Sequence, residues 1–322
     1  MIVTLTPNPS LDRTLHVSRL TRGRLLRADA VAVVASGKGV NVSRNVAANG
    51  VPTIVVLPVG GHDGHRLADE LAAERLQVRA VAIGGAVRSN ITLLEPDGTA
   101  TKVNEPGPVL TPAEQEALRH SAIESAAGAD WLVGSGSLPP GTPPDFYARL
   151  VQAARAAGDR TQVAVDCTGA ALLAAVAAGA DVVKPNAVEL AEATGRRLHT
   201  RQDVVTAARM LLDRGTGAVL ASLGTDGALL VTPAATWHAS GPPIRLHSTI
   251  GAGDALLAGF LAGGGTARPK AALALGVAYA TRRCALPASE QPRVQPSDMA
   301  AVAATMLADG VDVALSEPAL PA

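Results

Sequence analysis

The feature that most constrains the fold of this chain is an alternation of short β-branched runs with alanine-rich segments of helical period. The runs TIVVLPV (53–59), TQVAVDC (161–167) and DVVKPN (181–186) precede HRLADELAAE, AALLAAVAAGA and AVELAEATG, respectively. Strands that are apolar on both faces and separated by helices are typical of a parallel sheet covered on each side. The sequence therefore predicts an α/β fold, with a doubly wound, mainly parallel sheet and helices on both faces.

Two regions do not follow this alternation. Residues 10–36 and 84–106 show hairpin-like patterns, the second with PDG as its turn, and neither contains a helical segment. We expect them to form a small β-sheet attached to the main sheet, in the position of a lid. The whole chain, 1–322, is predicted to be one domain, and only its tail, LSEPALPA, is predicted to be loosely held.

Composition excludes several classes of protein. Lysine plus arginine equals aspartate plus glutamate at 28 each, so no basic field is present to bind nucleic acid. Two cysteines are too few for a disulfide framework, and no window reaches the ~20 apolar residues needed to span a bilayer. The sequence predicts a soluble, cytoplasmic enzyme that acts on small molecules and binds neither nucleic acid nor membrane.

Glycine-rich loops follow several predicted strands, at the edge where ligands of open α/β sheets bind. ASGKGVNVSRN (35–45) and GSGSLPPG (134–141) are two such loops. Neither these loops nor GAGDAL (251–256) continues to a third glycine at the spacing of the dinucleotide fingerprint, and no Walker A motif is present. The two commonest nucleotide-binding motifs are therefore not supported.

One carboxylate, Asp254, follows Gly-Ala-Gly in STIGAGDALLAGF (248–260) and precedes a helical run. The amides of Ala252, Gly253 and Asp254 would then form the free first turn of a helix, which is a favourable place for an anion. Phosphoryl transfer develops negative charge on the transferred group, and a neighbouring carboxylate can orient an attacking hydroxyl and accept its proton. The alternative is that Asp254 only caps the helix.

Taken in order, these motifs resemble those of the ribokinase-like PfkB family of carbohydrate kinases. SGKGVNVSRN and STIGAGDALLAG are similar to the two family signatures, and GSGSLPPG, KPNAVEL and SLGTDGALLV lie between them. The resemblance implies a ribokinase-like fold and an ATP- and Mg²⁺-dependent kinase. LTPNPSLDRT and VRSNITLLEPDGTATKVNEPGP resemble the branch that acts on ketohexose phosphates. This implies conversion of fructose 1-phosphate to fructose 1,6-bisphosphate, with tagatose 6-phosphate or fructose 6-phosphate as alternative substrates.

The resemblance also implies roles for individual residues on the sugar side. Asp254 would be the catalytic base, and Gly251, Ala252 and Gly253 would hold the transferring phosphoryl group. The sugar phosphate would contact Asp12, Arg27, Gly37, Lys38, Gly39, Asn41, Arg88, Asn90 and Ser137. Within this set the three cations are candidates for the phosphate already on the substrate, because a dianion favours charge-assisted donors.

On the nucleotide side, the resemblance implies roles for Asn186, Glu189, Ser222, Gly224 and Gly227. Glu189 would act on magnesium through water, since Mg²⁺ sheds its hydration shell reluctantly. Simpler interpretations stay open: Asn186 as a helix cap and Asp226-Gly227 as a plain hairpin turn.

Three further expectations lie outside this site. His62 and His65 in GGHDGHRL are spaced like metal ligands, but the loop has no thiol and we predict no metal there. Cys167 has no histidine placed locally to activate it, so a buried thiol is predicted. The edge of the lid sheet would be able to pair with a second chain, giving a homodimer. The alternative of another class is a non-catalytic sensor of sugar phosphate or nucleotide on the same fold.

Overall fold

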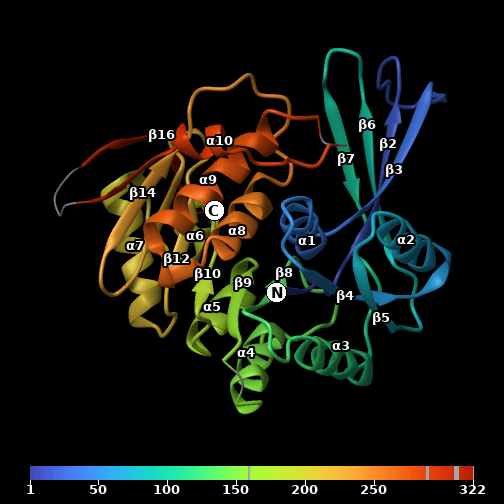
Figure 1. Ribbon diagram of the computed structural model, residues 1–322. Helices are drawn as coiled ribbons and strands as arrows, with labels where there is room; N and C mark the ends of the chain where they lie inside the picture. Colours follow the sequence, from blue (N-terminus) through green and yellow to red (C-terminus); the bar gives the residue numbers. More distant parts are fainter. Residues whose placement is uncertain (159, 288–289, 308–311, 322) are drawn as a thin grey trace.

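A ten-stranded sheet forms the centre of the structure. The structure is a computed structural model and describes residues 1–158, 160–287, 290–307 and 312–321. Its strand order is β15-β14-β13-β12-β10-β9-β8-β1-β4-β5 (Figure 1). The strands from β12 to β5 are parallel: β12 (Val219–Ser222), β10 (Val182–Val183), β9 (Gln162–Asp166), β8 (Trp131–Ser135), β1 (Ile2–Leu5), β4 (Thr53–Val59) and β5 (Gln77–Ala82). Three antiparallel strands extend one edge: β13 (Ala228–Val231), β14 (Thr236–Ser240) and β15 (Ala303–Met306).

Helices cover both faces of this sheet (Figure 1). In β1, Val3 and Leu5 pack into the core beneath one layer of helices, whereas Ile2 packs into the core beneath the other, as expected because successive strand residues point to opposite faces. The first layer contains α3 (Pro112–Ser125), α4 (Phe146–Ala156), α5 (Gly169–Ala177), α6 (Ala187–Thr194) and α7 (Arg201–Asp213). The second contains α1 (Lys38–Ala48), α8 (Ala252–Ala262) and α9 (Pro269–Cys284), with the short α10 (Pro296–Ala300) contacting α9. The predicted fold class is confirmed.

Local sequence explains where several helices begin. At α3, the Thr111 hydroxyl accepts a 3.2 Å hydrogen bond from the Glu114 amide, and the Glu114 carboxylate accepts one of 2.7 Å from the Thr111 amide. Thr200 and Asp203 form the same reciprocal pair at α7. Such a capping box satisfies amides that have no partner within the helix, and one cap contributes about 1 kcal/mol.

A second, four-stranded sheet of order β3-β2-β6-β7 stands apart from the main sheet (Figure 1). Its strands are β2 (Ser10–His16), β3 (Ala30–Ser36), β6 (Arg88–Leu94) and β7 (Ala100–Asn104). Two antiparallel hairpins, β2-β3 and β6-β7, are joined by parallel pairing of β2 with β6. Helix α2 (Gly61–Ala73) lies between this small sheet and strands β4 and β5, and contacts both. The small sheet expected from the two hairpin-like segments is therefore present.

The prediction of a loosely held tail is wrong. Strand β16 (Ala314–Ala319) pairs antiparallel with β11 (Leu198–Thr200), and Leu315 and Ala319 are buried in the main core. The carboxylate of Asp226 accepts hydrogen bonds of 2.7 Å from both the amide and the hydroxyl of Ser316. The apolar site that receives this strand is assembled from distant elements, so the tail sequence alone does not reveal it.

Within the part of the chain that the structure describes, every helix is too short or too polar to cross a bilayer.

Candidate active site

Helix α8 begins with the turn predicted for GAGD. Gly251 is the N-cap and has φ 76°, a left-handed conformation that favours glycine, and the helix starts at Ala252. Asp254 lies in this first turn with only 7% of its surface exposed. Its Oδ2 accepts a hydrogen bond of 2.8 Å from Nδ2 of Asn41 on α1. The carboxylate is therefore held between two helices, in the first turn of α8, where the Ala252 amide donates to the carbonyl oxygen of Thr249 at 3.2 Å.

A buried ion cluster lies beside this turn. Asp166, at the end of β9, is fully buried, and its Oδ1 lies 2.9 Å from Nζ of Lys38, the first residue of α1. Its Oδ2 lies 3.2 Å from Nζ of Lys184, which follows β10. A Cβ atom added to Gly253 would be 3.2 Å from the same Lys184 amine. The lysine therefore lies close to the first turn of α8, where it adds positive charge to the helix N-terminus.

The charges in this cluster control one another. Burial and the charge of Asp166 raise the pKa of Asp254 to about 6. Burial alone would raise the pKa of Asp166, but Lys184 and Lys38 outweigh it and hold that pKa below its usual value. Burial likewise opposes the charge of Lys38, yet Asp166 and Glu189 raise its pKa. Asp254 is therefore ionised at neutral pH but close enough to its pKa to accept a proton.

The small sheet carries a second group of predicted residues. Nδ2 of Asn90 donates to Oδ1 of Asp12 at 2.9 Å and to Oγ of Ser10 at 3.0 Å, and Ser10 donates to Asp12 at 2.8 Å. Asp12 and Asn90 are direct partners in the β2-β6 register, which explains their contact.

Arg88 and Ser137 are connected through Asn8, which follows β1. Arg88 donates to the carbonyl oxygens of Glu105 at 3.0 Å and Asn8 at 3.2 Å, while Nδ2 of Asn8 lies 3.3 Å from Oγ of Ser137. Nε of Arg88 is buried and has no hydrogen-bond partner among the described residues. Burial lowers the pKa of Arg88, although a guanidinium stays charged at any physiological pH.

Arg27 is not brought to these groups. The end of the β2-β3 hairpin nearest α1 pairs Ser10 with Ser36, and the far end pairs His16 with Ala30. Arg27 is exposed in the connection beyond that far end. The glycines of the same predicted set lie close to β1: a Cβ atom on Gly37 or Gly39 would contact the Thr6 side chain at 2.7 and 2.4 Å, respectively.

Among the residues predicted to contact the nucleotide, the structure shows the helix cap that was the alternative role for Asn186. Asn186 is the N-cap of α6: its Oδ1 accepts from the Glu189 amide at 2.9 Å, and Oε2 of Glu189 accepts from the Asn186 amide at 2.8 Å. The other carboxylate oxygen of Glu189, Oε1, takes no part in the cap and lies 4.0 Å from Nζ of Lys38. Ser222 forms an isolated parallel β-bridge with Asn186, and its amide donates to the carbonyl oxygen of Pro185 at 3.1 Å.

The hairpin turn from β12 to β13 contains the short 3₁₀ helix η1 (Gly224–Asp226). A Cβ atom on Gly227 would lie 2.0 Å from the carbonyl oxygen of Ala239 on β14. Close strand packing thus explains this glycine on its own, and nucleotide binding by Gly224 and Gly227 remains a prediction.

Three residues of the site were not selected from the sequence: Asn8, Asp166 and Lys184. Each is a polar residue at the end of a strand or within three residues after it, on β1, β9 and β10, which is the edge where ligands of open α/β sheets bind. Cys167, next to Asp166, is buried as predicted, and burial raises the pKa of its thiol well above the usual range.

Comparison with known proteins decides the family. A model described as pfkB family carbohydrate kinase matches residues 6–286. The chain belongs to this family.

Individual relatives of this pfkB kinase are phosphofructokinases, in agreement with the family. It is 40% identical to a 1-phosphofructokinase of Haloferax volcanii over 81% of the chain and 83% of that protein. It is 36% identical to the ATP-dependent 6-phosphofructokinase isozyme 2 of Mycobacterium tuberculosis over 81% and 77%. The crystal structure of Escherichia coli phosphofructokinase-2 with substrates and products superimposes with a TM-score of 0.83 at 31% identity, covering 93% and 97% of the two chains. The predicted family and enzyme class, an ATP-dependent sugar-phosphate kinase, are confirmed.

Proposed function

We propose that this kinase transfers the γ-phosphoryl group of ATP to a hydroxyl of fructose 1-phosphate, forming fructose 1,6-bisphosphate. The observation that carries the proposal is Asp254, a buried carboxylate with a raised pKa in the first turn of α8, beside Asn41 and the Asp166 cluster. The relative named 1-phosphofructokinase supports this substrate. Tagatose 6-phosphate and fructose 6-phosphate are the alternatives.

On the sugar side, the proposal assigns the hydroxyls to Asp12, Asn90 and Asn41, which supply carboxylate and amide groups on β2, β6 and α1. The phosphate is assigned to Arg88, with Ser137 beside it. The buried Nε of Arg88 supports this assignment, because a phosphate oxygen would supply the partner that the described residues do not. Lys38 and the glycines at 37 and 39 remain further predicted contacts. The prediction for Arg27 is not retained, because this residue lies beyond the far end of the β2-β3 hairpin.

The transfer step needs a base and a place for negative charge. As the substrate oxygen bonds to the γ-phosphorus, the bond from that phosphorus to the bridging oxygen breaks, ADP leaves, and the hydroxyl proton passes to Asp254. The Gly253 amide and the Lys184 ammonium would stabilise the charge on the transferring group, and the Ala252 amide would join them on exchanging its bond to the Thr249 carbonyl oxygen for the phosphoryl group. A pKa of about 6 suits Asp254 to this step.

The family implies Mg²⁺ with the nucleotide, and the residues present fit an ion carried mainly by phosphates and water. Among the described residues no three His, Cys, Asp or Glu side chains gather as a metal site. Oε1 of Glu189 is outside the α6 capping pair, and Oδ2 of Asp166 lies 3.2 Å from Nζ of Lys184. These oxygens would hold the ion through water, and the bound ion would neutralise phosphate charge.

Assembly and location belong to the same proposal. We expect a homodimer formed through the small sheet, because β3 is one of its edges and exposes Val31 and Val34. The solved Escherichia coli phosphofructokinase-2 includes a tetrameric form, so light scattering should distinguish a dimer from a larger assembly. Two free cysteines, Cys167 and Cys284, support the predicted cytoplasmic location.

The experiment is a coupled assay of ADP release with ATP, Mg²⁺ and each of three sugar phosphates: fructose 1-phosphate, fructose 6-phosphate and tagatose 6-phosphate. The proposal expects the highest kcat/KM with fructose 1-phosphate. A higher value with another of the three reassigns the substrate. Saturable binding of a sugar phosphate by calorimetry, without turnover of any of the three, would instead identify a sensor.

A further inference from the structure

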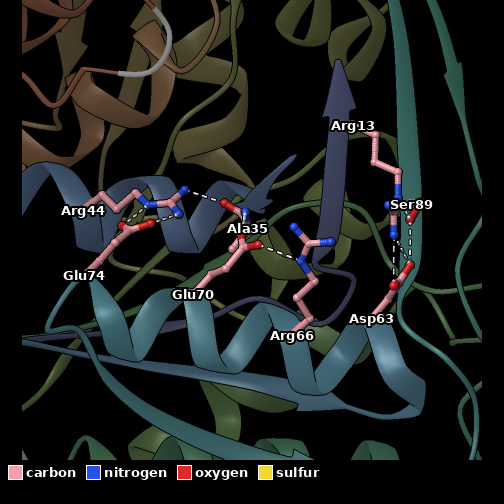
Figure 2. A network of polar contacts seen from close by, with 8 residues as sticks. All are labelled: Arg13, Ala35, Arg44, Asp63, Arg66, Glu70, Glu74 and Ser89. Carbon is pink, nitrogen blue, oxygen red and sulfur yellow. Dashed lines mark hydrogen bonds and ion pairs between the residues drawn. The ribbon is translucent and has the colours of Figure 1, made fainter. Parts of the chain in front are cut away.

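Three acidic residues, two on helix α2 and one at its C-cap, contact the small sheet and α1 (Figure 2). The Glu74 carboxylate binds Arg44 of α1, with both contacts at 2.6 Å. Glu70 accepts a 3.0 Å hydrogen bond from the Ala35 amide of β3. Asp63, in the first turn of α2, contacts β2 and β6, the two strands that carry Asp12, Arg88 and Asn90.

The contacts of Asp63 form a closed triangle. Nη2 of Arg13 lies 3.0 Å from both carboxylate oxygens of Asp63, and Oγ of Ser89 lies 3.0 Å from Oδ2. Nε of Arg13 donates to the same Ser89 hydroxyl at 3.2 Å. The Arg13 and Asp63 side chains are 31% and 26% exposed, so water screens this pair less than it screens a surface ion pair.

Strand alternation connects the triangle to the proposed substrate face. Arg13 directly follows Asp12 on β2, and Ser89 lies between Arg88 and Asn90 on β6. Successive strand residues point to opposite faces. The face with Arg13 and Ser89 therefore turns toward α2, and the opposite face carries Asp12, Arg88 and Asn90. Leu11, two residues before Arg13, agrees with this: it is fully buried in a core that includes Leu67 of α2.

We propose that Asp63 is a positioning residue, which holds β2 and β6 through Arg13 and Ser89 so that the opposite face of the small sheet is set for the sugar phosphate. The inference rests on the proposed function, because the substrate that this face receives is the one proposed above. Asp63 itself touches no reacting group. It acts by restricting the angle and register of two strands that are joined to the main sheet by loops.

The test compares Asp63→Asn with Asp69→Asn. Both changes remove one negative charge from α2, but Asp69 is exposed on that helix. We expect Asp63→Asn to raise the KM for the sugar phosphate about fivefold to twentyfold while the KM for ATP changes less than about twofold. Asp69→Asn should leave both unchanged. Adding Arg13→Gln to Asp63→Asn should raise the sugar-phosphate KM no further, because both changes break the same contact.

Hydrogen exchange provides a readout that does not depend on turnover. In Asp63→Asn, without substrate, amides in 10–16 and 88–94 should exchange faster than in the parent, and those in α8 should not. If the parent phosphorylates none of the three sugar phosphates, the proposed function fails, while exchange still decides whether Asp63 holds these strands. Equal increases in both KM values, unchanged kinetics, or faster exchange throughout the chain would each overturn the positioning role.

Discussion

At the residue scale, the proposed mechanism depends most on Asp254. Asp254→Asn keeps the shape of the side chain and its contact with Asn41, but it removes the proton acceptor. We expect kcat to fall by about 10²–10⁴-fold, while the KM values for sugar phosphate and ATP change little. Steady-state kinetics measure this directly. Because asparagine caps helices about as well as aspartate, near-parental turnover would return Asp254 to the role of a cap.

The raised pKa of Asp254 also predicts how stability depends on pH. Because the folded protein binds this proton more tightly than the unfolded chain, the group stabilises the fold fully below about pH 4, and that contribution is lost as pH rises through about 6. Asp254→Asn does not titrate there. It should be more stable than the parent by about 2–3 kcal/mol at pH 8 and about equally stable at pH 3.5.

Denaturant unfolding of parent and Asp254→Asn across this pH range checks the prediction. A stability difference that is constant with pH would mean that Asp254 has an ordinary pKa in the folded protein. Kinetics should agree, since kcat/KM of the parent should fall as pH drops through about 6.

At the scale of single elements, α6 can separate the two roles left open for its first turn. Glutamine can replace glutamate in a capping box, so Glu189→Gln should leave the melting temperature nearly unchanged. If Glu189 also holds water on magnesium, the same variant should need more Mg²⁺ for half-maximal turnover. A thermal melt and a magnesium titration on this one variant measure both effects.

Asn186→Ala is the matched control for the cap. It removes the side-chain acceptor for the Glu189 amide and should destabilise the protein by about 1 kcal/mol. An unchanged magnesium titration in Glu189→Gln would leave Glu189 with the structural role alone.

At the scale of the whole molecule, the C-terminal strand closes the fold. Leu315 of β16 is buried in the main core, whereas Leu320 is 52% exposed. Leu315→Ala should reduce the free energy of unfolding by about 2–4 kcal/mol, because it leaves a cavity in that core. Leu320→Ala, the same change on the surface, should cost little. Equal, small effects in urea unfolding would show that the tail contributes nothing to the core.

Much of the fold could be predicted because its signals are local. The alternation around 53–59 and 161–167 depends on residues within one strand or helix, and those strands form as expected. The α8 turn was also readable, since glycine and a following helical run determine a helix start within a few residues. The tail was misjudged because the partner of β16 lies more than a hundred residues earlier, in β11.

What the sequence by itself determined is therefore the class of sheet, the small sheet's two hairpins, the family, and the turn that carries Asp254. Only the tertiary structure decided which polar groups meet: Asn41 with Asp254, 213 residues apart, Lys38 with Asp166, 128 apart, and Arg13 with Asp63, 50 apart. The physical reason is that hydrophobic periodicity and turn geometry act over a few neighbouring residues. Strand order, by contrast, depends on packing the whole core. That order brings these polar groups within hydrogen-bond distance, and their proximity shifts the pKa values of the charged ones.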